Sequence, residues 1–479
     1  MKLEYVASGT SFMCLGKPVI SKDPQLADVI NNIFTEFFGD QPNHTFSILY
    51  NAWAEKSYGE RLSKFKTSVH NLHADSGGLQ MVTLSHKLKP GTNMDELREE
   101  VYNNQADWAD VGMSFDEIPV VVLPNIKKVF DKELNKEVEI DVGSDRNDTR
   151  FRYFDRENRQ KYAKQTAENI KRQIEVFKAK NSTCKPFMIC QGGDLETYLE
   201  WTNTILETVP KEDHKNIAGV AMGGAALGTG PLEDIQKAFF ASQVPVRDEN
   251  GKLNLHVLGV GSASRMIPYL IFLQNGLYGN VHISYDSTTH SRAVDTGMYY
   301  MLGEIKNGVY VEGKPKTLNF TRATTNEDVL PGEKPKNREP DVNYRVMLED
   351  VKKYYPLDLS LDRFHEILNV PSVPYLKKYG SLVDWYEVRT AFCCASIKNF
   401  MCTIENLMHD KEALVALANT KYPAGAAEQL FDVKDIDTFN VWLNKWSNVF
   451  EEKNLSKRIV HSYEDTDLGN NMEVDLSGI

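Results

Sequence analysis

One arrangement recurs along the first two thirds of the chain: a short apolar run, then glycine or a polar residue, then an amphipathic stretch with helical spacing. The runs are HNLHADSGG (70–78), FMICQGGD (187–194), IAGVAMGG (217–224), LHVLGVGS (255–262) and VHISYDS (281–287), with MSFDEIPVVVL (113–123) as a sixth. Apolar runs this short, bounded by glycine, are typical of buried parallel strands. The pattern therefore predicts strands that alternate with helices.

Residues 159–180 give the clearest helical pattern between these runs. Their apolar positions recur at spacings of four and three and fall on one face: Ala163, Ala167, Ile170, Ile174 and Phe177. Alternation of this kind over about 300 residues predicts an α/β fold, a (β/α)8 TIM-like barrel with insertions. In such a barrel the polar residues at the carboxyl ends of the strands converge on one mouth.

The polar and glycine residues at the predicted strand ends are the candidate site residues. They are Asp75, Ser76, Asp116, Gln191, Gly223, Gly224, Gly261 and Asp286. Asp75 and Asp286 follow different strands and could face each other, and carboxylates about 5 Å apart serve retaining glycosyl transfer. An Asp in this place is at least as often the N-cap of the next helix. The two glycines after Ser76 favour a site, because they let the backbone approach a ligand closely.

The character of the sequence changes after residue 302. We expect the barrel over residues 1–302, a basic connecting segment rich in Pro and Gly over 303–341, a mainly α-helical C-terminal domain over 342–455 and a flexible acidic tail over 456–479.

The charge of the chain excludes a simple electrostatic binder of nucleic acid, because 55 Lys and Arg against 67 Asp and Glu leave a net charge of −12. Phosphate contacts must come from local basic patches, and segments 127–152 and 313–338 are the candidates, although solvated loops explain them equally well. The N-terminus lacks a signal-peptide pattern and the apolar runs fall short of the roughly 20 residues that span a bilayer. We therefore expect a cytoplasmic protein without a membrane partner, with reduced cysteines.

Six segments match, in order, the motifs of a known family. HADSGGLQ (73–80), SFDEIPV (114–120), MICQGG (188–193), GVAMGGAALG (219–228), HVLGVGS (256–262) and ISYDSTTHSRAVDTG (283–297) resemble the D-S-G-G-[FY]-Q, F-D-E, V-Q-G-G, G-x-x-x-G-G-x-x-x-G, M-G-V-G-T and D-x5-R-x4-G motifs of the tRNA-guanine transglycosylases. These enzymes exchange guanine in a polynucleotide for a 7-deazaguanine base. The forms ADSGGLQ, FDEIPV and SYDST look most like the DNA-acting branch, phage-type and bacterial.

The resemblance implies a role for each matching residue. Asp286 looks like the nucleophile that attacks C1′ of the nucleoside, and Asp75 like the general acid/base. Asp116, Gln191 and the backbone at Gly223 and Gly224 match positions that read the purine-like edge, Ser76 supports that pocket, Leu79 and Leu258 clamp the base, and Arg292 holds a phosphate. A surface ion pair is the plainer explanation of Arg292.

Several positions depart from the family pattern. Leu79 and Leu258 are aliphatic where the family usually has an aromatic residue and bacterial members have Met, and His290-Ser291 replaces Pro-Thr. Thr229 stands where bacterial members have a Glu that suits a cationic base, so a neutral 7-cyano-7-deazaguanine-like base is expected.

The zinc motif of the family, C-x-C-x2-C with a distant His, is absent from the sequence. The nearest set, Cys393, Cys394, Cys402 and His409, reads as one helix, in which Cys402 and His409 lie about 10 Å apart along the axis. Core cysteines are the better interpretation, and Cys190, inside a predicted strand, is expected to pack as a small apolar residue. We expect no metal and no cofactor.

Three functions follow from these features. The first is an active base-exchange transglycosylase with DNA favoured over tRNA as its polynucleotide, in the host cytoplasm if the protein is phage-encoded. The second is a non-catalytic subunit of such an enzyme, which would be free to lose the nucleophile. The third is an unrelated barrel glycosidase, which leaves Asp116 and Gln191 unexplained. DNA or tRNA and a 7-deazaguanine base are the expected partners, and a homodimer is possible.

Overall fold

The computed structural model describes residues 2–8, 46–63, 71–78, 91–122, 126–131, 136–141, 151–223, 230–291, 299–307, 309–311, 348–354, 360 and 383–455. Leu79, Gly224, Thr229 and Arg292 lie outside the described residues, as do segments 312–347 and 456–479.

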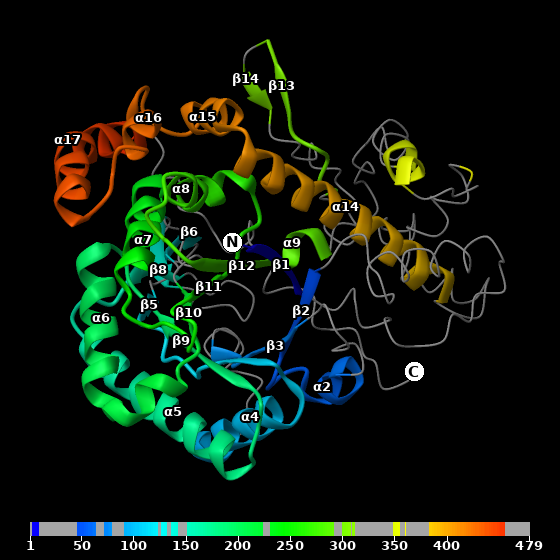
Figure 1. The fold of residues 1–479 in the computed structure, drawn as a ribbon, viewed down its shortest axis with the longest axis vertical. Coiled ribbons are helices and arrows are strands. Elements are labelled where there is room, and N and C mark those ends of the chain that lie inside the picture. The colour runs from blue at the N-terminus through cyan, green and yellow to red at the C-terminus, as the bar shows by residue number, and fades with distance from the viewer. Residues whose placement is uncertain are drawn as a thin grey trace.

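A closed parallel barrel forms the centre of the described chain, with its strands in the order β1-β12-β11-β10-β9-β4-β3-β2 (Figure 1). The strands are β1 (Lys2–Ser8), β2 (Phe46–Asn51), β3 (Leu72–Asp75), β4 (Val111–Met113), β9 (Lys185–Cys190), β10 (Gly219–Met222), β11 (Leu253–Val257) and β12 (Val281–Ser287). The predicted (β/α)8 fold class is therefore confirmed. Strands β1 and β2 lie outside the runs that the sequence pattern identifies.

Helices surround the barrel (Figure 1). They are α2 (Lys56–Ser63), α4 (Met94–Trp108), α5 (Arg159–Ala179), α6 (Leu195–Thr208), α7 (Pro231–Gln243) and α8 (Ala263–Gln274), with the short α9 (Thr288–Ser291) after β12 and the 3-10 helix η3 (Lys211–Asn216) after α6. The predicted helix over 159–180 is confirmed as α5. All five residues of its predicted apolar stripe are buried.

The prediction of one continuous strand over residues 113–123 is wrong. Strand β4 ends at Met113, and β5 (Val120–Val122) instead pairs antiparallel with β8 (Phe151–Phe154) in a separate two-stranded sheet. Residues 114–119 between the two strands form no strand, and Pro119, which has no N–H to give to a ladder, directly precedes β5.

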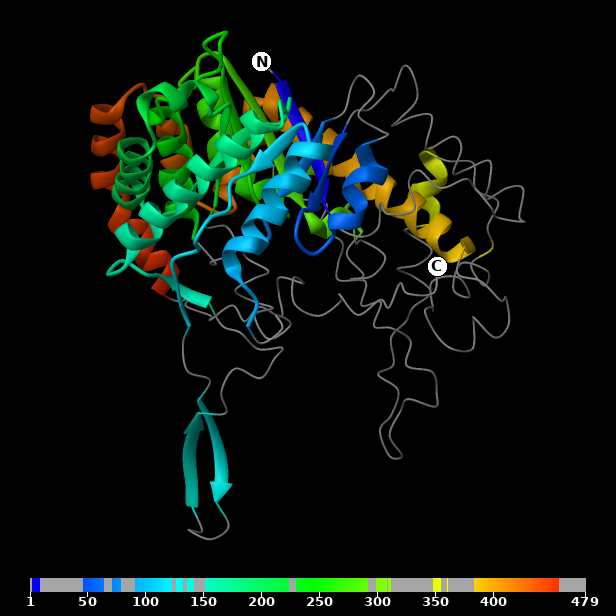
Figure 2. The same cartoon turned by 90° about the horizontal axis from the view of Figure 1, so that it is seen from below.

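The insertion between β4 and α5 also contains the hairpin of β6 (Ile126–Asp131) and β7 (Lys136–Asp141), which projects away from the barrel in Figure 2. Lys127 and Lys128 of the predicted basic patch are on β6, whereas Arg146 and Arg150 lie outside the described residues.

The C-terminal part begins with the hairpin of β13 (Glu304–Lys306) and β14 (Val309–Val311), and continues in α14 (Val383–His409), α15 (Lys411–Asn419), α16 (Ala426–Leu430) and α17 (Ile436–Leu455). The helices pack on the barrel helices: the rings of Phe239 and Phe439 stack with centroids 3.8 Å apart, and Gln274 Nε2 donates to the carbonyl of Leu407 at 2.9 Å. Both parts therefore share one hydrophobic core. No helix of the described ranges combines the length and apolarity needed to cross a membrane.

The interior of the barrel is apolar on one side. Val111, Met113, Phe187, Ile189 and Ala221 of β4, β9 and β10 form a buried cluster of their own, separate from the core between strands and helices. The alternate residues of β9, Met188 and Cys190, belong to that outer core. This period of two is the one expected when successive side chains of a strand point to opposite faces.

Candidate active site

The structure places the predicted residues that it describes at the carboxyl ends of the barrel strands. Asp75 ends β3, Asp286 lies near the end of β12, and Asp116, Gln191, Gly223 and Leu258 follow β4, β9, β10 and β11. These ends converge in a closed parallel barrel, so residues far apart in the sequence come to one mouth.

Asp286 is 6% exposed, and three neighbouring groups hold its carboxylate. Gly259 N–H donates to Oδ1 at 2.9 Å, and the Ser8 hydroxyl donates to Oδ2 at 3.2 Å. Nε2 of His256 lies 3.5 Å from Oδ1. Ser8 ends β1 and was not predicted from the sequence, although Gly9 follows it directly. The oxygens of Asp286 thus have fixed positions at the mouth.

Asp75 is largely buried, and its surroundings favour the protonated form. Burial raises its pKa from 3.8 to about 6, and the negative charge of Asp286 contributes in the same direction. Hydrogen bonds from the backbone N–H groups of Gly77 and Ser76 partly oppose this shift. Both carboxylates lie at the carboxyl ends of barrel strands, and that they act together on one substrate stays a prediction. A carboxyl group with this pKa can both give and take a proton near neutral pH.

Asn51 is a site residue that the sequence pattern missed. It ends β2 beside Asp75 in the strand register, and its Oδ1 accepts from the N–H groups of Trp53 and Ala54 at 3.0 and 2.8 Å. Its Nδ2 is buried without a hydrogen-bond partner within the described ranges. A Cβ on Gly77 would lie 2.8 Å from Asn51 Oδ1, and Gly77 has a φ of +81°, so only glycine suits that turn.

Asp116 and Gln191 form a second polar pair. Gln191 Nε2 donates to Asp116 Oδ2 at 2.6 Å, and Gln191 Oε1 is buried with no partner in the described part of the chain. Burial raises the pKa of Asp116 to about 7, the Gln191 hydrogen bond opposes this shift, and the charge of Asp75 adds to it. The pair can therefore offer a ligand a carboxyl group in either protonation state and an amide oxygen.

Two glycines make room for this pair. A Cβ on Gly78 would lie 2.7 Å from Asp116 Oδ1, and a Cβ on Gly223 would lie 2.4 Å from Gln191 Nε2. Ser76 is fully buried and its Oγ accepts from Gly78 N–H at 3.2 Å, which fixes the turn. A Cβ at Gly78 or Gly223 would thus displace the side chain of Asp116 or Gln191 from its place.

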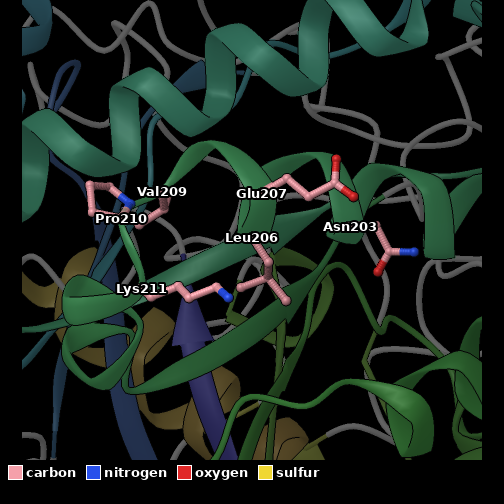
Figure 3. Close-up of a pocket in the computed structure, with 6 residues that line it drawn as sticks. All are labelled: Asn203, Leu206, Glu207, Val209, Pro210 and Lys211. Atoms are coloured by element: carbon pink, nitrogen blue, oxygen red, sulfur yellow. The ribbon is translucent and has the colours of Figure 1, made fainter.

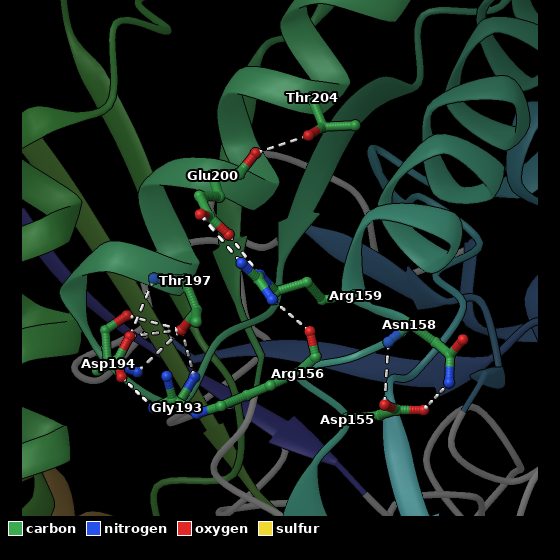
Figure 4. A network of polar contacts seen from close by, with 9 residues as sticks. All are labelled: Asp155, Arg156, Asn158, Arg159, Gly193, Asp194, Thr197, Glu200 and Thr204. Carbon is green, nitrogen blue, oxygen red and sulfur yellow. Dashed lines mark hydrogen bonds and ion pairs between the residues drawn. The ribbon is translucent and has the colours of Figure 1, made fainter.

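A network of polar contacts fixes the loop that carries Gln191 (Figure 4). Asp194 caps α6 by accepting from Thr197 N–H at 3.0 Å, and Thr197 Oγ1 accepts from Gly193 N–H at 3.0 Å. Arg156 forms an ion pair with Asp194, and Arg159 forms one with Glu200. The loop after β9 is therefore held by the cap of α6 and by Arg156 in the turn before α5, and the Arg159–Glu200 pair joins the two helices.

Glu117 is directed to other partners. Arg98 donates to its Oε1 at 2.6 Å, and its backbone N–H donates to Thr166 Oγ1 at 3.0 Å. Because Arg98 occupies the carboxylate of Glu117, this acid next to Asp116 does not offer the site a second free carboxylate.

The interior of the barrel below Asp286 is polar, in contrast to the β4, β9 and β10 side. Glu4 of β1 accepts from Ser47 and lies 2.6 Å from Nε2 of His282. Burial alone would raise the pKa of Glu4, but the hydrogen bonds from His282 and Ser47 and the nearby His73 ring hold it far below its ordinary value. His73 is buried against His256, with ring centroids 5.5 Å apart, and burial lowers its pKa to about 3.

Cys190, Cys393 and Cys394 lie in packed surroundings. Cys190 is buried with its Sγ 3.2 Å from Thr202 Oγ1, and burial raises its pKa to about 12, as expected for a packing residue. Cys393 and Cys394 are fully buried on α14, and the predicted single helix through His409 is confirmed. The described residues include no group of three His, Cys, Asp or Glu suited to a metal ion. That the protein lacks zinc stays a prediction for elemental analysis.

A hollow of about 360 Å³ lies at the end of α6 and the start of η3, lined by Leu206, Val209 and Lys211 among others (Figure 3). It involves none of the strand-end residues described above, and we assign it no part in the site.

The fold and the mouth define the class: a parallel (β/α)8 barrel with acidic side chains gathered at the carboxyl ends of its strands. A scan against protein-family models finds no match for this chain, and a search of curated proteins finds none either. Among solved structures, the chain is similar to a proposed sugar phosphate isomerase/epimerase from Anabaena variabilis, with 14% identity and a TM-score of 0.28 over 74% of this chain and 99% of that chain. A likeness of this extent carries no argument about activity.

Proposed function

We propose that this protein is a base-exchange transglycosylase that replaces guanine in a polynucleotide with a 7-deazaguanine, through a covalent glycosyl-aspartate. The observation that carries the proposal is the pairing of two unlike sites at one mouth. Asp75 and Asp286 lie at the carboxyl ends of β3 and β12, and Asp116 and Gln191 form a separate hydrogen-bonded pair after β4 and β9. A glycosidase needs the first pair only.

The residues divide the reaction between them. A carboxylate oxygen of Asp286 forms a bond to C1′ while the bond from C1′ to the base breaks, and the departing guanine takes a proton from Asp75. The incoming base then gives a proton to Asp75 and attacks C1′, and the electron pair of the C1′–O bond returns to Asp286. A pKa of about 6 suits Asp75 to both proton transfers.

Asp116 and Gln191 recognise the base. Guanine and 7-deazaguanines present an N–H and an amino group on one edge, and a carboxylate accepts from both kinds of donor. The buried, unpartnered Oε1 of Gln191 offers a further acceptor among the described residues. Leu258 packs against the apolar interior cluster below this pair and offers an aliphatic contact.

The proposed base is neutral, like 7-cyano-7-deazaguanine. A buried ammonium needs a carboxylate partner, and Glu117, the acid next in sequence to Asp116, is paired with Arg98. In competition between the 7-cyano and 7-aminomethyl bases, we expect the higher specificity constant for the cyano base. A higher constant for the aminomethyl base would refute this choice and leave the nucleophile assignment intact.

DNA is the proposed polynucleotide and tRNA the alternative. The form of the motifs supports DNA, and so does the lack of the family's zinc motif in the sequence. In duplex DNA the target nucleotide must leave the stack before C1′ can be attacked.

The decisive experiment is exchange of radiolabelled guanine, run side by side on duplex DNA, single-stranded DNA and tRNA, with the Asp286→Asn variant as the control. Incorporation into DNA by the native protein, with none by the Asp286→Asn variant, supports the proposal. Incorporation into tRNA only would show that the polynucleotide substrate is tRNA and not DNA. Absence of incorporation into any of the three substrates would contradict the proposed function.

A further inference from the structure

The Asp286 carboxylate has a neighbour that the resemblance does not explain. His256 of β11 is fully buried, with Nε2 3.5 Å from Asp286 Oδ1 and Nδ1 2.8 Å from Ser284 Oγ. At 3.5 Å the approach to Asp286 is longer than an ordinary hydrogen bond, so its effect is electrostatic. The direction of that effect depends on which ring nitrogen carries the proton.

The surroundings of the ring decide the tautomer. The Ser284 hydroxyl has one proton and two acceptors in reach, Nδ1 at 2.8 Å and the Leu255 carbonyl at 3.3 Å. Donation to the nearer Nδ1 leaves the proton of a neutral imidazole on Nε2, facing Asp286. The opposite tautomer would place a lone pair of Nε2 against a buried carboxylate, which is repulsive.

We propose that His256 is a positioning residue for the nucleophile, held by Ser284 as the tautomer that presents Nε2–H to Oδ1 of Asp286. The consequence for catalysis rests on the proposed function, whereas the tautomer does not. His73, whose ring packs beside His256, has no hydrogen-bond partner for either nitrogen in the described ranges. It is therefore a matched buried histidine without this role.

The two oxygens of Asp286 then become unequal. Oδ1 receives Gly259 N–H and faces His256 Nε2–H, while among the described residues Oδ2 receives only the Ser8 hydroxyl. Oδ2 is the freer oxygen and forms the bond to C1′, and Oδ1 becomes the carbonyl oxygen of the ester. When the ester breaks, the electron pair of the C1′–Oδ2 bond returns to the carboxylate, and the donors at Oδ1 stabilise the returning charge. His256 therefore assists breakdown of the ester more than its formation.

The first test reads the tautomer without any substrate. Nuclear magnetic resonance of the full protein with ¹⁵N-labelled histidine should show His256 as the Nε2–H form, assigned by the signal that His256→Gln removes. Asp286→Asn should shift this signal and move that of His73 less. An Nδ1–H tautomer at His256 would overturn the proposal.

The second test reads the reaction by rapid quenching. We expect His256→Phe to slow ester breakdown by about tenfold, which corresponds to about 1.4 kcal/mol, and to raise the fraction of enzyme held as covalent adduct. His256→Gln, which keeps a donor near the position of Nε2, should restore most of the rate, and His73→Phe should leave the adduct fraction near that of the native protein. Equal effects of His256→Phe and His73→Phe would show that His256 contributes by packing only. If neither the native protein nor the variants form an adduct, the proposed function fails, and the first test still decides the tautomer of His256.

Discussion

Strands β4, β9 and β10 line their side of the barrel interior with apolar side chains, whereas β1, β2, β3, β11 and β12 contribute carboxylates, imidazoles and hydroxyls to the other. Phe187 and Ile189 represent the first side, and Glu4, His256 and Asp286 the second. Burial of apolar surface stabilises the fold, but each buried polar group costs free energy unless it has a partner. A barrel keeps such a polar side only where something other than stability requires it.

The mouth follows the same division. Asp75 and Asp286 stand above the polar side, and Asp116 and Gln191 follow β4 and β9 above the apolar side. In the proposed reaction, the charged chemistry at C1′ belongs to the polar side, and recognition of the flat base belongs to the apolar side. Substitutions on each side should therefore have different effects, and four measurements test this.

Asp286→Asn should have the largest effect on exchange. The amide is similar in size but is a poor nucleophile, so we expect a loss of at least about 10⁴-fold, the scale found when a nucleophile is removed. The thermal midpoint should change little. A covalent adduct trapped on any other residue would contradict the assignment.

Asp75→Asn should lower turnover by about 10²- to 10⁴-fold, the usual contribution of general acid–base catalysis. Because formation of the adduct needs protonated Asp75, its rate in the native protein should fall as pH rises through about 6, the raised pKa of this group. Attack by the incoming base needs the ionised form and should show the opposite dependence. Single-turnover rates of each step across pH measure both, and near-normal exchange by the variant would move the role elsewhere.

Ile189→Ala tests the apolar side. Ile189 is 1% exposed in the interior cluster, and truncation of a buried Ile costs about 2–5 kcal/mol. We expect that loss in the free energy of unfolding from urea titration, with the rate of adduct formation by the folded fraction changed far less than by Asp75→Asn. A cost below about 1 kcal/mol would show that this side is less tightly packed than the structure indicates.

His73→Phe tests the polar side of the barrel interior, and its expected effect, on stability against pH, is the smallest of the four. Its pKa in the folded protein is about 3 against an ordinary value of 6.5, so the unfolded chain binds a proton that the folded chain does not as pH falls between these values. Stability is therefore fully present above pH 6.5 and is lost toward pH 3. Urea midpoints at pH 7 and pH 4.5 should differ less in His73→Phe than in the native protein, and an unchanged difference would show that His73 is not the origin of the loss.

The signals that worked were local. Glycine-bounded runs at Asp75, Gln191 and Asp286 identified strand ends, and the stripe on α5 identified a helix. The run through Pro119 misled, because an apolar composition does not show where a ladder is interrupted. Strand β2 lacks a flanking glycine, so Asn51 was missed, and Ser8 was missed although Gly9 follows it directly, because Lys2 and Glu4 interrupt the apolar run of β1.

The sequence by itself determined the class of fold and the strand ends that carry acids, because these depend on residues close together in the chain, and the roles proposed for those acids come from its motifs. Only the tertiary structure decided which distant groups touch Asp286. Ser8 comes from the first strand and reaches Asp286 because β1 closes the barrel against β12, whereas His256 and Gly259 reach it through the pairing of β11 with β12. Parallel pairing fixes that register through backbone hydrogen bonds, which leave no mark on the spacing of side chains along the sequence.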